Sequence, residues 1–155
     1  MEGITSFEMQ SKDKATLPPK GEGMQSITSL AVPPHILVLD DDILFGKILS
    51  KIASLKQVPL TFCTSVREVG KLPNWKFDIA IVDYDLGLVT GLQFVNYLER
   101  FMNTVPVILV SQYRQIKAAK WPTSVKGFIH KSVGPYEIFN MAVRIHEDSK
   151  ATPLT

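Results

Sequence analysis

Between residues 35 and 148 the chain alternates between two hydrophobic patterns. Five short apolar runs without polar alternation predict strands that are covered on both faces, at 35–39, 60–63, 78–82, 107–110 and 127–130. Between these runs, apolar residues recur every three or four positions, which predicts helices at 43–55, 65–72, 91–102, 113–120 and 135–147. The alternation therefore predicts an α/β domain in which helices cover both faces of a parallel sheet.

The segment before the first strand lacks this alternation. Residues 1–34 mix Ser, Thr, Gln, Lys, Gly and Pro, and they contain too few apolar residues to offset the entropy that ordering would cost. We therefore expect a flexible N-terminal extension at 1–34, one domain at 35–148 and a frayed C-terminal tail at 149–155.

Net charge, hydrophobicity and cysteine content limit the kinds of partner and the compartment that we expect for this protein. The 155 residues carry a net charge of only +2, which argues against nucleic-acid binding through charge alone. No apolar run approaches the roughly 20 residues of a membrane span, and the N-terminus does not resemble a secretory signal. The lone Cys63 excludes an internal disulfide and fits a reducing compartment. We therefore expect a cytoplasmic protein with no membrane partner and no direct nucleic-acid partner.

Acidic side chains follow two of the predicted strands. Asp40, Asp41 and Asp42 follow the first strand, and Asp83 and Asp85 follow the third. Ligands of a parallel α/β sheet collect beyond the carboxyl ends of its strands, so we expect these carboxylates to converge. Several carboxylates without a cation would repel one another, and a set of oxygen ligands suits Mg²⁺. A solvated turn is the alternative for the first group.

A hydroxyl group and an amine follow two further strands. Ser111 ends the fourth predicted strand, and Lys131 follows the fifth. A lysine ammonium group holds a phosphoryl oxygen as a point charge, and a serine hydroxyl donates to the same group. A carboxylate nucleophile, a metal ion, a lysine and a hydroxyl group together indicate a site for phosphoryl transfer.

Four motifs carry a resemblance to a known family. They are "ILVLDD", "IAIVDYDLGLVTG", "PVILVS" and "KGFIHK", in this order and each at the end of a strand. Over residues 35 to about 147 the chain resembles the receiver domain of two-component response regulators, in particular the single-domain regulators of the chemotaxis type. The resemblance implies a flavodoxin-like, doubly wound (βα)5 fold, with five parallel strands in the order 2-1-3-4-5.

The resemblance also implies an acceptor and its metal ligands. Asp83 would accept the phosphoryl group. Asp41 would bind Mg²⁺ directly and Asp40 mainly through water, together with Asp83 and the main-chain carbonyl of Asp85. Asp42 lies just outside this set, and we expect it to cap the first helix.

The remaining roles concern the response to phosphorylation. The resemblance implies that Ser111 turns toward the phosphoryl group and that Phe128 occupies the place of the aromatic residue that swings inward on activation. Lys131 would pair with the acceptor or with its phosphate. A phenylalanine on a central strand is more often simply part of the core. His35, His130 and His146 show no metal-ligand spacing, and the sequence assigns them no function.

Two residues depart from the family pattern. Gly87 stands four residues after the acceptor, where the family often has proline, and Ser132 stands where proline usually follows the lysine in a cis bond. A cis bond before a residue other than proline costs about 2.5–4 kcal/mol. We therefore predict a trans Lys131–Ser132 bond and an altered loop after the fifth strand.

These expectations combine into a function and two alternatives. We expect a stand-alone, Mg²⁺-dependent phospho-aspartate switch that receives its phosphoryl group from a sensor histidine kinase or a histidine phosphotransfer protein. Such a protein is not an enzyme with an external substrate, because it catalyses only its own phosphorylation and dephosphorylation. The signal would pass to a partner on the face formed by residues 113–147. The alternatives are a pseudo-receiver that only binds a partner, and a phosphatase of the haloacid-dehalogenase type suggested by "DYDLG".

Overall fold

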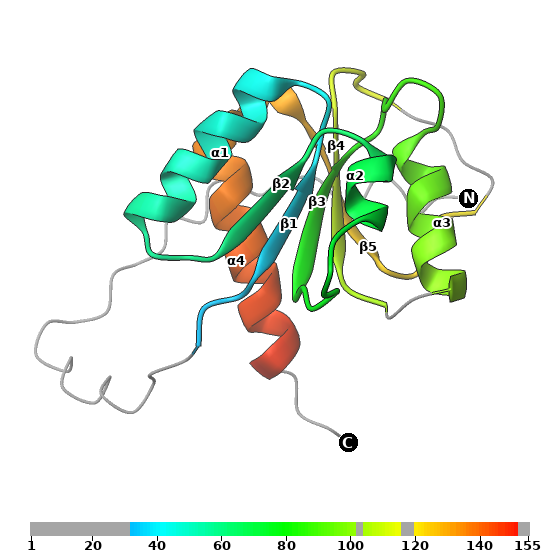
Figure 1. Ribbon diagram of the computed structural model, residues 1–155. Coiled ribbons are helices and arrows are strands. Elements are labelled where there is room, and N and C mark those ends of the chain that lie inside the picture. The colour runs from blue at the N-terminus through cyan, green and yellow to red at the C-terminus, as the bar shows by residue number, and fades with distance from the viewer. Residues whose placement is uncertain (1–31, 102–103, 116–119, 152–155) are drawn as a thin grey trace, which may run out of the picture. The chain divides into compact units, whose positions relative to one another are not determined.

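Five parallel strands form one sheet in the order β2-β1-β3-β4-β5 (Figure 1). The computed structural model describes residues 32–101, 104–115 and 120–151. Its strands are β1 (Ile36–Leu39), β2 (Leu60–Cys63), β3 (Ile79–Asp83), β4 (Val107–Ser111) and β5 (Val125–His130). Its helices are α1 (Ile43–Leu55), α2 (Val66–Gly70), α3 (Gly91–Phe101) and α4 (Pro135–Ala151), with a 3-10 turn, η3, at Lys131–Val133. The predicted flavodoxin-like sheet and its strand order are confirmed.

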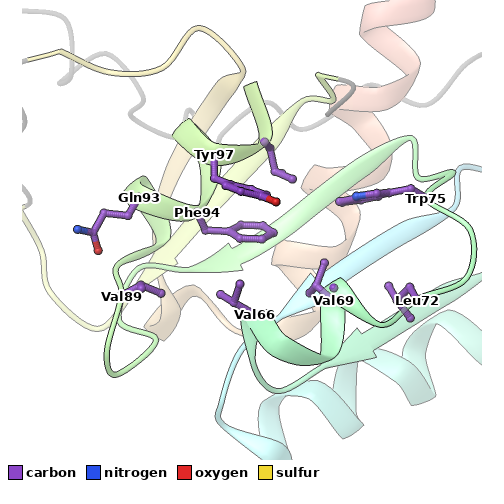
Figure 2. Close-up of a pocket in the computed structure, with 10 residues that line it drawn as sticks. Val66, Val69, Leu72, Trp75, Val89, Gln93, Phe94 and Tyr97 are labelled. Atoms are coloured by element: carbon purple, nitrogen blue, oxygen red, sulfur yellow. The ribbon is translucent and has the colours of Figure 1, made fainter. Parts of the chain in front are cut away.

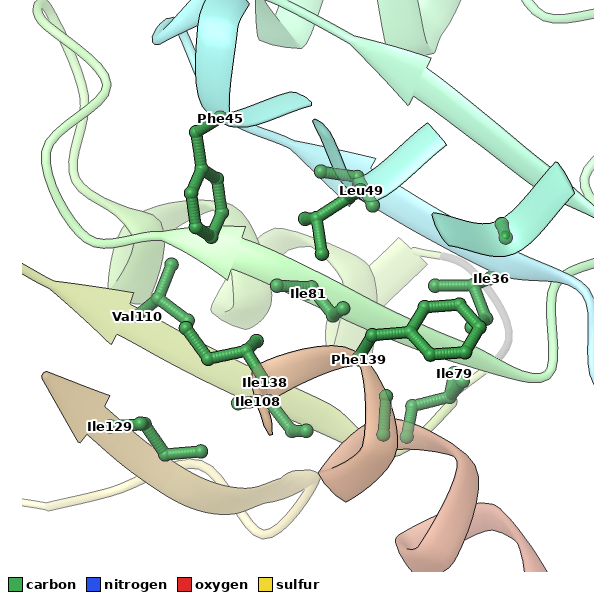
Figure 3. Packing of buried hydrophobic residues seen from close by; sticks show 13 residues of the cluster. Ile36, Phe45, Leu49, Ile79, Ile81, Ile108, Val110, Ile129, Ile138 and Phe139 are labelled. Carbon is green, nitrogen blue, oxygen red and sulfur yellow. The ribbon is translucent and has the colours of Figure 1, made fainter. Parts of the chain in front are cut away.

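The sheet divides the apolar core into two layers. Helices α1 and α4 cover one face, and α2 and α3 cover the other (Figure 1). Successive residues of each strand point to opposite faces, so the apolar runs supply both layers. In the first layer, Phe139 of α4 and Leu49 of α1 pack against Ile81 and its neighbours (Figure 3). This burial on both faces explains why the three central strands, β1, β3 and β4, are apolar up to their carboxyl ends.

Asp42 caps the start of helix α1, as predicted. The main-chain N–H of Phe45 donates to Oδ1 of Asp42 at 3.1 Å, which satisfies one of the free donors of the first turn. The spacing of apolar residues predicts one buried stripe formed by Phe45, Ile48, Leu49, Ile52 and Leu55. This prediction is partly wrong, because Ile48 is 38% exposed and Leu55 is 73% exposed. The small residue Gly46 instead faces the sheet, where the ring of Phe62 fills the space beside it.

The other helices differ from the prediction mainly at their ends. Helix α2 stops at Gly70, and α4 continues to Ala151, three residues into the expected tail. For the helix predicted at 113–120, residues 116–119 lie outside the described residues, and 113–115 are not helical. The expected extension at 1–34 also lies almost entirely outside them. No helix in the described part of the chain is long and apolar enough to cross a membrane.

A cavity of about 540 Å³ lies between α2 and α3. Figure 2 shows Val66, Val69 and Leu72 on one wall and Phe94 and Tyr97 on the other. Helix α2, on one side of this cavity, is only five residues long. The residues that line it are Val66, Val69, Gly70, Leu72, Trp75, Val89, Gln93, Phe94, Tyr97 and Leu98.

Candidate functional site

The predicted polar residues meet at the carboxyl edge of the sheet. Asp83 is the last residue of β3 and Ser111 is the last residue of β4. Asp40 directly follows β1, and Lys131 directly follows β5. Because all five strands are parallel, residues separated by up to 91 positions in the chain come to the same edge.

Lys131 lies between two buried carboxylates. Its Nζ atom is 2.8 Å from Oδ2 of Asp40 and 3.7 Å from Oδ2 of Asp83. The same ammonium group lies over the ring of Phe45, 4.7 Å from the ring centroid. The other oxygen of Asp40 accepts a hydrogen bond of 2.9 Å from the main-chain N–H of Asp42. These contacts fix the orientation of Asp40.

Three carboxylates are close enough to share a cation. One oxygen from each of Asp40, Asp41 and Asp83 lies within 4.8 Å of the other two. Asp40 and Asp83 are buried, whereas Asp41 is exposed and can be reached from solvent. A set of carboxylate oxygens fits a hard divalent cation such as Mg²⁺, which also keeps some of its waters. The donor chemistry therefore fits the predicted metal, with Asp40, Asp41 and Asp83 as candidate ligands.

The charges of this cluster are not balanced by the protein alone. Burial raises the pKa of Asp83 from 3.8 to about 7, and the neighbouring Asp40 adds to the rise. Lys131 offsets only part of it. Burial also raises the pKa of Asp40, although Lys131 and the main-chain N–H of Asp42 act in the opposite direction. The cluster thus holds more negative charge than one lysine compensates, and a bound cation would relieve this imbalance.

An opening of about 190 Å³ leads to the carboxylate of Asp83. The side chain of Asp85, one of the predicted metal residues, lies at this opening and is exposed. Its Oδ1 atom accepts a hydrogen bond of 3.2 Å from the main-chain N–H of Gly87. Gly87 has a φ angle of +88°, a conformation that suits glycine and excludes the proline that is common here in the family. The opening is lined by Asp41, Asp42, Asp83, Asp85, Gln112, Tyr113 and Lys131.

The two predicted switch residues differ in their surroundings. Ser111 is buried, and its Oγ atom accepts a hydrogen bond of 2.8 Å from the main-chain N–H of Tyr113. Phe128 is half-buried and packs in the layer under α3, with its ring centroid 5.9 Å from that of Trp121. Ser111 therefore lies at the same edge of the sheet as Asp83, whereas Phe128 belongs to the apolar layer under α3.

One residue near the site was missed in the sequence. His130 pairs with Ser111 in the register of β4 and β5, and its ring contacts the main chain of Gln112 and Ser132. The pattern of the sequence contains no signal for this arrangement, because it depends on the register of two strands and on the shape of the following turn. That turn contains the predicted trans Lys131–Ser132 bond.

The fold and the site together define a class of protein. The model of the response regulator receiver domain matches residues 36–143, so the chain belongs to this family. No curated protein matches the chain in sequence.

Solved structures agree in fold. The chain is similar to a CheY-like receiver domain protein from Methanospirillum hungatei, with 17% identity over 76% of this chain and 97% of that one and a TM-score of 0.67. A receiver domain from Francisella has 16% identity over 75% and 98% of the two chains and a TM-score of 0.65. The regulator TrrA from Thermotoga maritima, solved in complex with Mg²⁺ and BeF, has 16% identity over 72% and 97% and a TM-score of 0.61.

Proposed function

We propose that this chain is a Mg²⁺-dependent phospho-aspartate switch in two-component signalling. The observation that carries the proposal is the position of the Lys131 ammonium group, 2.8 Å from Asp40 and 3.7 Å from Asp83, beside three carboxylates that suit a divalent cation. A purely structural ion pair between Lys131 and Asp40 would explain neither the second carboxylate, Asp83, beside the lysine nor the opening that exposes the site to solvent.

The side chains divide the chemistry among them. A carboxylate oxygen of Asp83 forms a bond to the phosphorus of the donor, while the bond from phosphorus to the leaving group breaks and its electron pair stays with that group. Lys131 then holds a phosphoryl oxygen as a point charge. Asp40, Asp41, Asp83 and the main-chain carbonyl of Asp85 would hold Mg²⁺, which neutralises charge on the transferred oxygens when bound. Hydrolysis of the acyl phosphate by water resets the switch.

Phosphorylation would then shift a population of conformations. The hydroxyl group of Ser111 keeps its own proton available, because its contact with Tyr113 uses only the oxygen as an acceptor. A shift from 1:99 to 99:1 requires about 5.5 kcal/mol. Hydrogen bonds from Ser111 and Lys131 to the phosphoryl group, at about 1.5–3 kcal/mol each, approach this value. In this proposal Phe128 moves with the loop that carries Ser111.

The partners follow from the same mechanism. The phosphoryl donor is a sensor histidine kinase or a histidine phosphotransfer protein, and the output partner binds the face formed by residues 113–147. The receiver domain comprises residues 35–148, works in the cytoplasm and acts on no external substrate. This assignment is supported by the family match and by the four residues that meet at one edge of the sheet.

Labelling with acetyl phosphate tests the proposal. We expect one phosphoryl group per chain in the presence of Mg²⁺, stable in acid and labile in alkali and hydroxylamine, as an acyl phosphate requires. Asp83→Asn should abolish the label, because an amide is not an acceptor, and Asp41→Ala should lose most of it through lost metal. Glu147→Gln, an exposed change on α4, serves as the control. Label on a serine or histidine would refute the mechanism, and no label on the wild type would favour the pseudo-receiver.

A further inference from the structure

The ring of His130 bridges the two segments that carry Ser111 and Lys131. In the sheet, His130 lies opposite Ser111. Its Nε2 atom is 2.9 Å from the carbonyl oxygen of Gln112, which follows Ser111. Its Nδ1 atom is 3.1 Å from the main-chain nitrogen of Ser132, which follows Lys131, and 2.7 Å from Oγ of the same serine. One side chain thus joins both loops.

The chemistry of the partners determines the tautomer of the ring. A carbonyl oxygen only accepts, so Nε2 must carry the proton that it donates to Gln112. A main-chain N–H only donates, so Nδ1 must be unprotonated to accept from Ser132. The neutral Nε2–H form satisfies both partners at once. The two contacts are therefore compatible with each other.

We propose that His130 is a positioning residue for Lys131, an inference that rests on the proposed function. His130 is the N-cap of the turn η3, which begins at Lys131. A cap that satisfies the free N–H of Ser132 fixes the direction in which Lys131 leaves β5. The bond from Nε2 to the carbonyl oxygen of Gln112 anchors the ring to the segment after β4. The ring therefore fixes the position of Lys131 relative to the loop that follows Ser111. His130 itself contacts none of the reacting atoms.

The departure of Ser132 from the family pattern makes this cap possible. Proline has no main-chain N–H, so a proline at 132 would leave Nδ1 of His130 without its donor. In this chain His130, rather than a proline at position 132, therefore restricts the conformation of the loop that carries Lys131.

Three substitutions at position 130 separate the bond to Gln112 from the two contacts with Ser132. His130→Ala removes all three. His130→Asn places an acceptor near the position of Nδ1 and keeps the cap on Ser132, whereas His130→Gln places an N–H donor near Nε2 and keeps the bond to Gln112. Ser132→Ala removes the hydroxyl contact and retains the main-chain N–H, so it shows whether the main-chain cap alone holds the turn. Should the alanine variant fail to fold, the asparagine and glutamine variants carry the comparison.

The first measurement is by NMR and does not depend on phosphorylation. We expect the ring nitrogens of His130 to show the Nε2–H tautomer. The amide of Ser132 should exchange slowly in the wild type, Ser132→Ala and His130→Asn, but faster in His130→Ala and His130→Gln. The side-chain signals of Lys131 should shift in His130→Ala and stay in place in Ser132→Ala. Unchanged Lys131 signals in His130→Ala would overturn the positioning role, whether or not the protein is phosphorylated.

The second measurement is the rate of labelling by acetyl phosphate at saturating Mg²⁺. His130→Ala should lower this rate about 10- to 100-fold, the usual effect of losing a residue that orients a site ligand. The affinity for Mg²⁺ should stay within about twofold, since the carboxylates are unchanged, and Ser132→Ala should label like the wild type. An unchanged rate, or a fall matched by an equal loss of Mg²⁺ affinity, would refute the inference. A wild type that takes no label refutes the proposed function alone, and the NMR result then decides the role of His130.

Discussion

The carboxyl group of Asp83 destabilises the fold when it is ionised without a metal. Its pKa of about 7 in the folded protein lies above its ordinary value of 3.8, because burial and the neighbouring Asp40 penalise the charged form. At pH values between about 4 and about 7, Asp83 is protonated to a greater extent in the folded state than in the unfolded state. The free energy of unfolding should therefore fall as the pH rises from about 4 to about 7, and stay low above that.

Asp83→Asn should remove the part of this dependence that comes from Asp83. Without metal, we expect the variant to melt at a higher temperature than the wild type at pH 8. The difference should shrink toward pH 4, because Asp83 is protonated in the folded state there and no longer carries a buried charge. Thermal unfolding in the presence of a chelator measures this. Glu147→Gln controls for the loss of one negative charge. A gain of equal size at pH 4 and pH 8 would contradict the explanation.

Magnesium should stabilise the same carboxylates. A cation that binds only the folded state raises the melting temperature with its concentration, and its ligands must first lose their protons. We therefore expect a larger rise at pH 8 than at pH 5.5, because Asp83 is mostly protonated at the lower pH. Asp41→Ala should lose most of the shift at both pH values. An equal shift in Asp41→Ala and the wild type would place the metal elsewhere.

At the scale of the helices, two glycines should respond in opposite ways to alanine. A Cβ atom at Gly46 of α1 would overlap the ring of Phe62, whereas one at Gly70 of α2 would meet nothing within 4 Å. We expect Gly70→Ala to stabilise the protein by about 0.4–1 kcal/mol through the unfolded chain. Gly46→Ala should destabilise it by about 1–3 kcal/mol through overpacking, despite the higher helix propensity of alanine.

Urea unfolding of both variants measures this contrast. Phe62→Leu supplies the control, because a smaller side chain at this position should reduce the penalty of Gly46→Ala. If Gly46→Ala is as stable as the wild type, the ring of Phe62 moves aside freely and the contact does not restrict this position.

The helices and strands were predictable from the sequence where the pattern of apolar and polar residues within each segment was sufficient to identify it. The strands were found because residues buried on both faces read as unbroken apolar runs, and Asp42 was recognisable as a cap from its place before α1. The buried face of α1 was predictable only in part, since Ile48 is exposed and the small Gly46 is buried against Phe62 of β2 instead. The convergence of the carboxylates followed from topology. The role inferred for His130 was not predictable, because it depends on the register of β4 and β5, which places His130 opposite Ser111.

For the whole molecule, the sheet keeps the two apolar layers apart. Ile138 of α4 is fully buried in one layer, and Leu98 of α3 is buried in the other. Ile138→Val should cost about 0.5–1.5 kcal/mol and Leu98→Ala about 2–5 kcal/mol. Because the two side chains share no cluster, the double variant should equal the sum within about 0.5 kcal/mol. Chemical denaturation of the four proteins measures this, and a larger deviation would show that the sheet transmits strain.

This division has a consequence for how such a chain changes over generations. Substitutions under α1 and α4 alter one layer and leave the packing under α2 and α3 as it was. Each side can therefore drift through its own series of neutral replacements, without waiting for a compensating change across the sheet. The carboxyl edge is different, because residues after β1, β3, β4 and β5 meet there. A lineage that remodels one side for a new partner thus inherits the same edge with its chemistry intact.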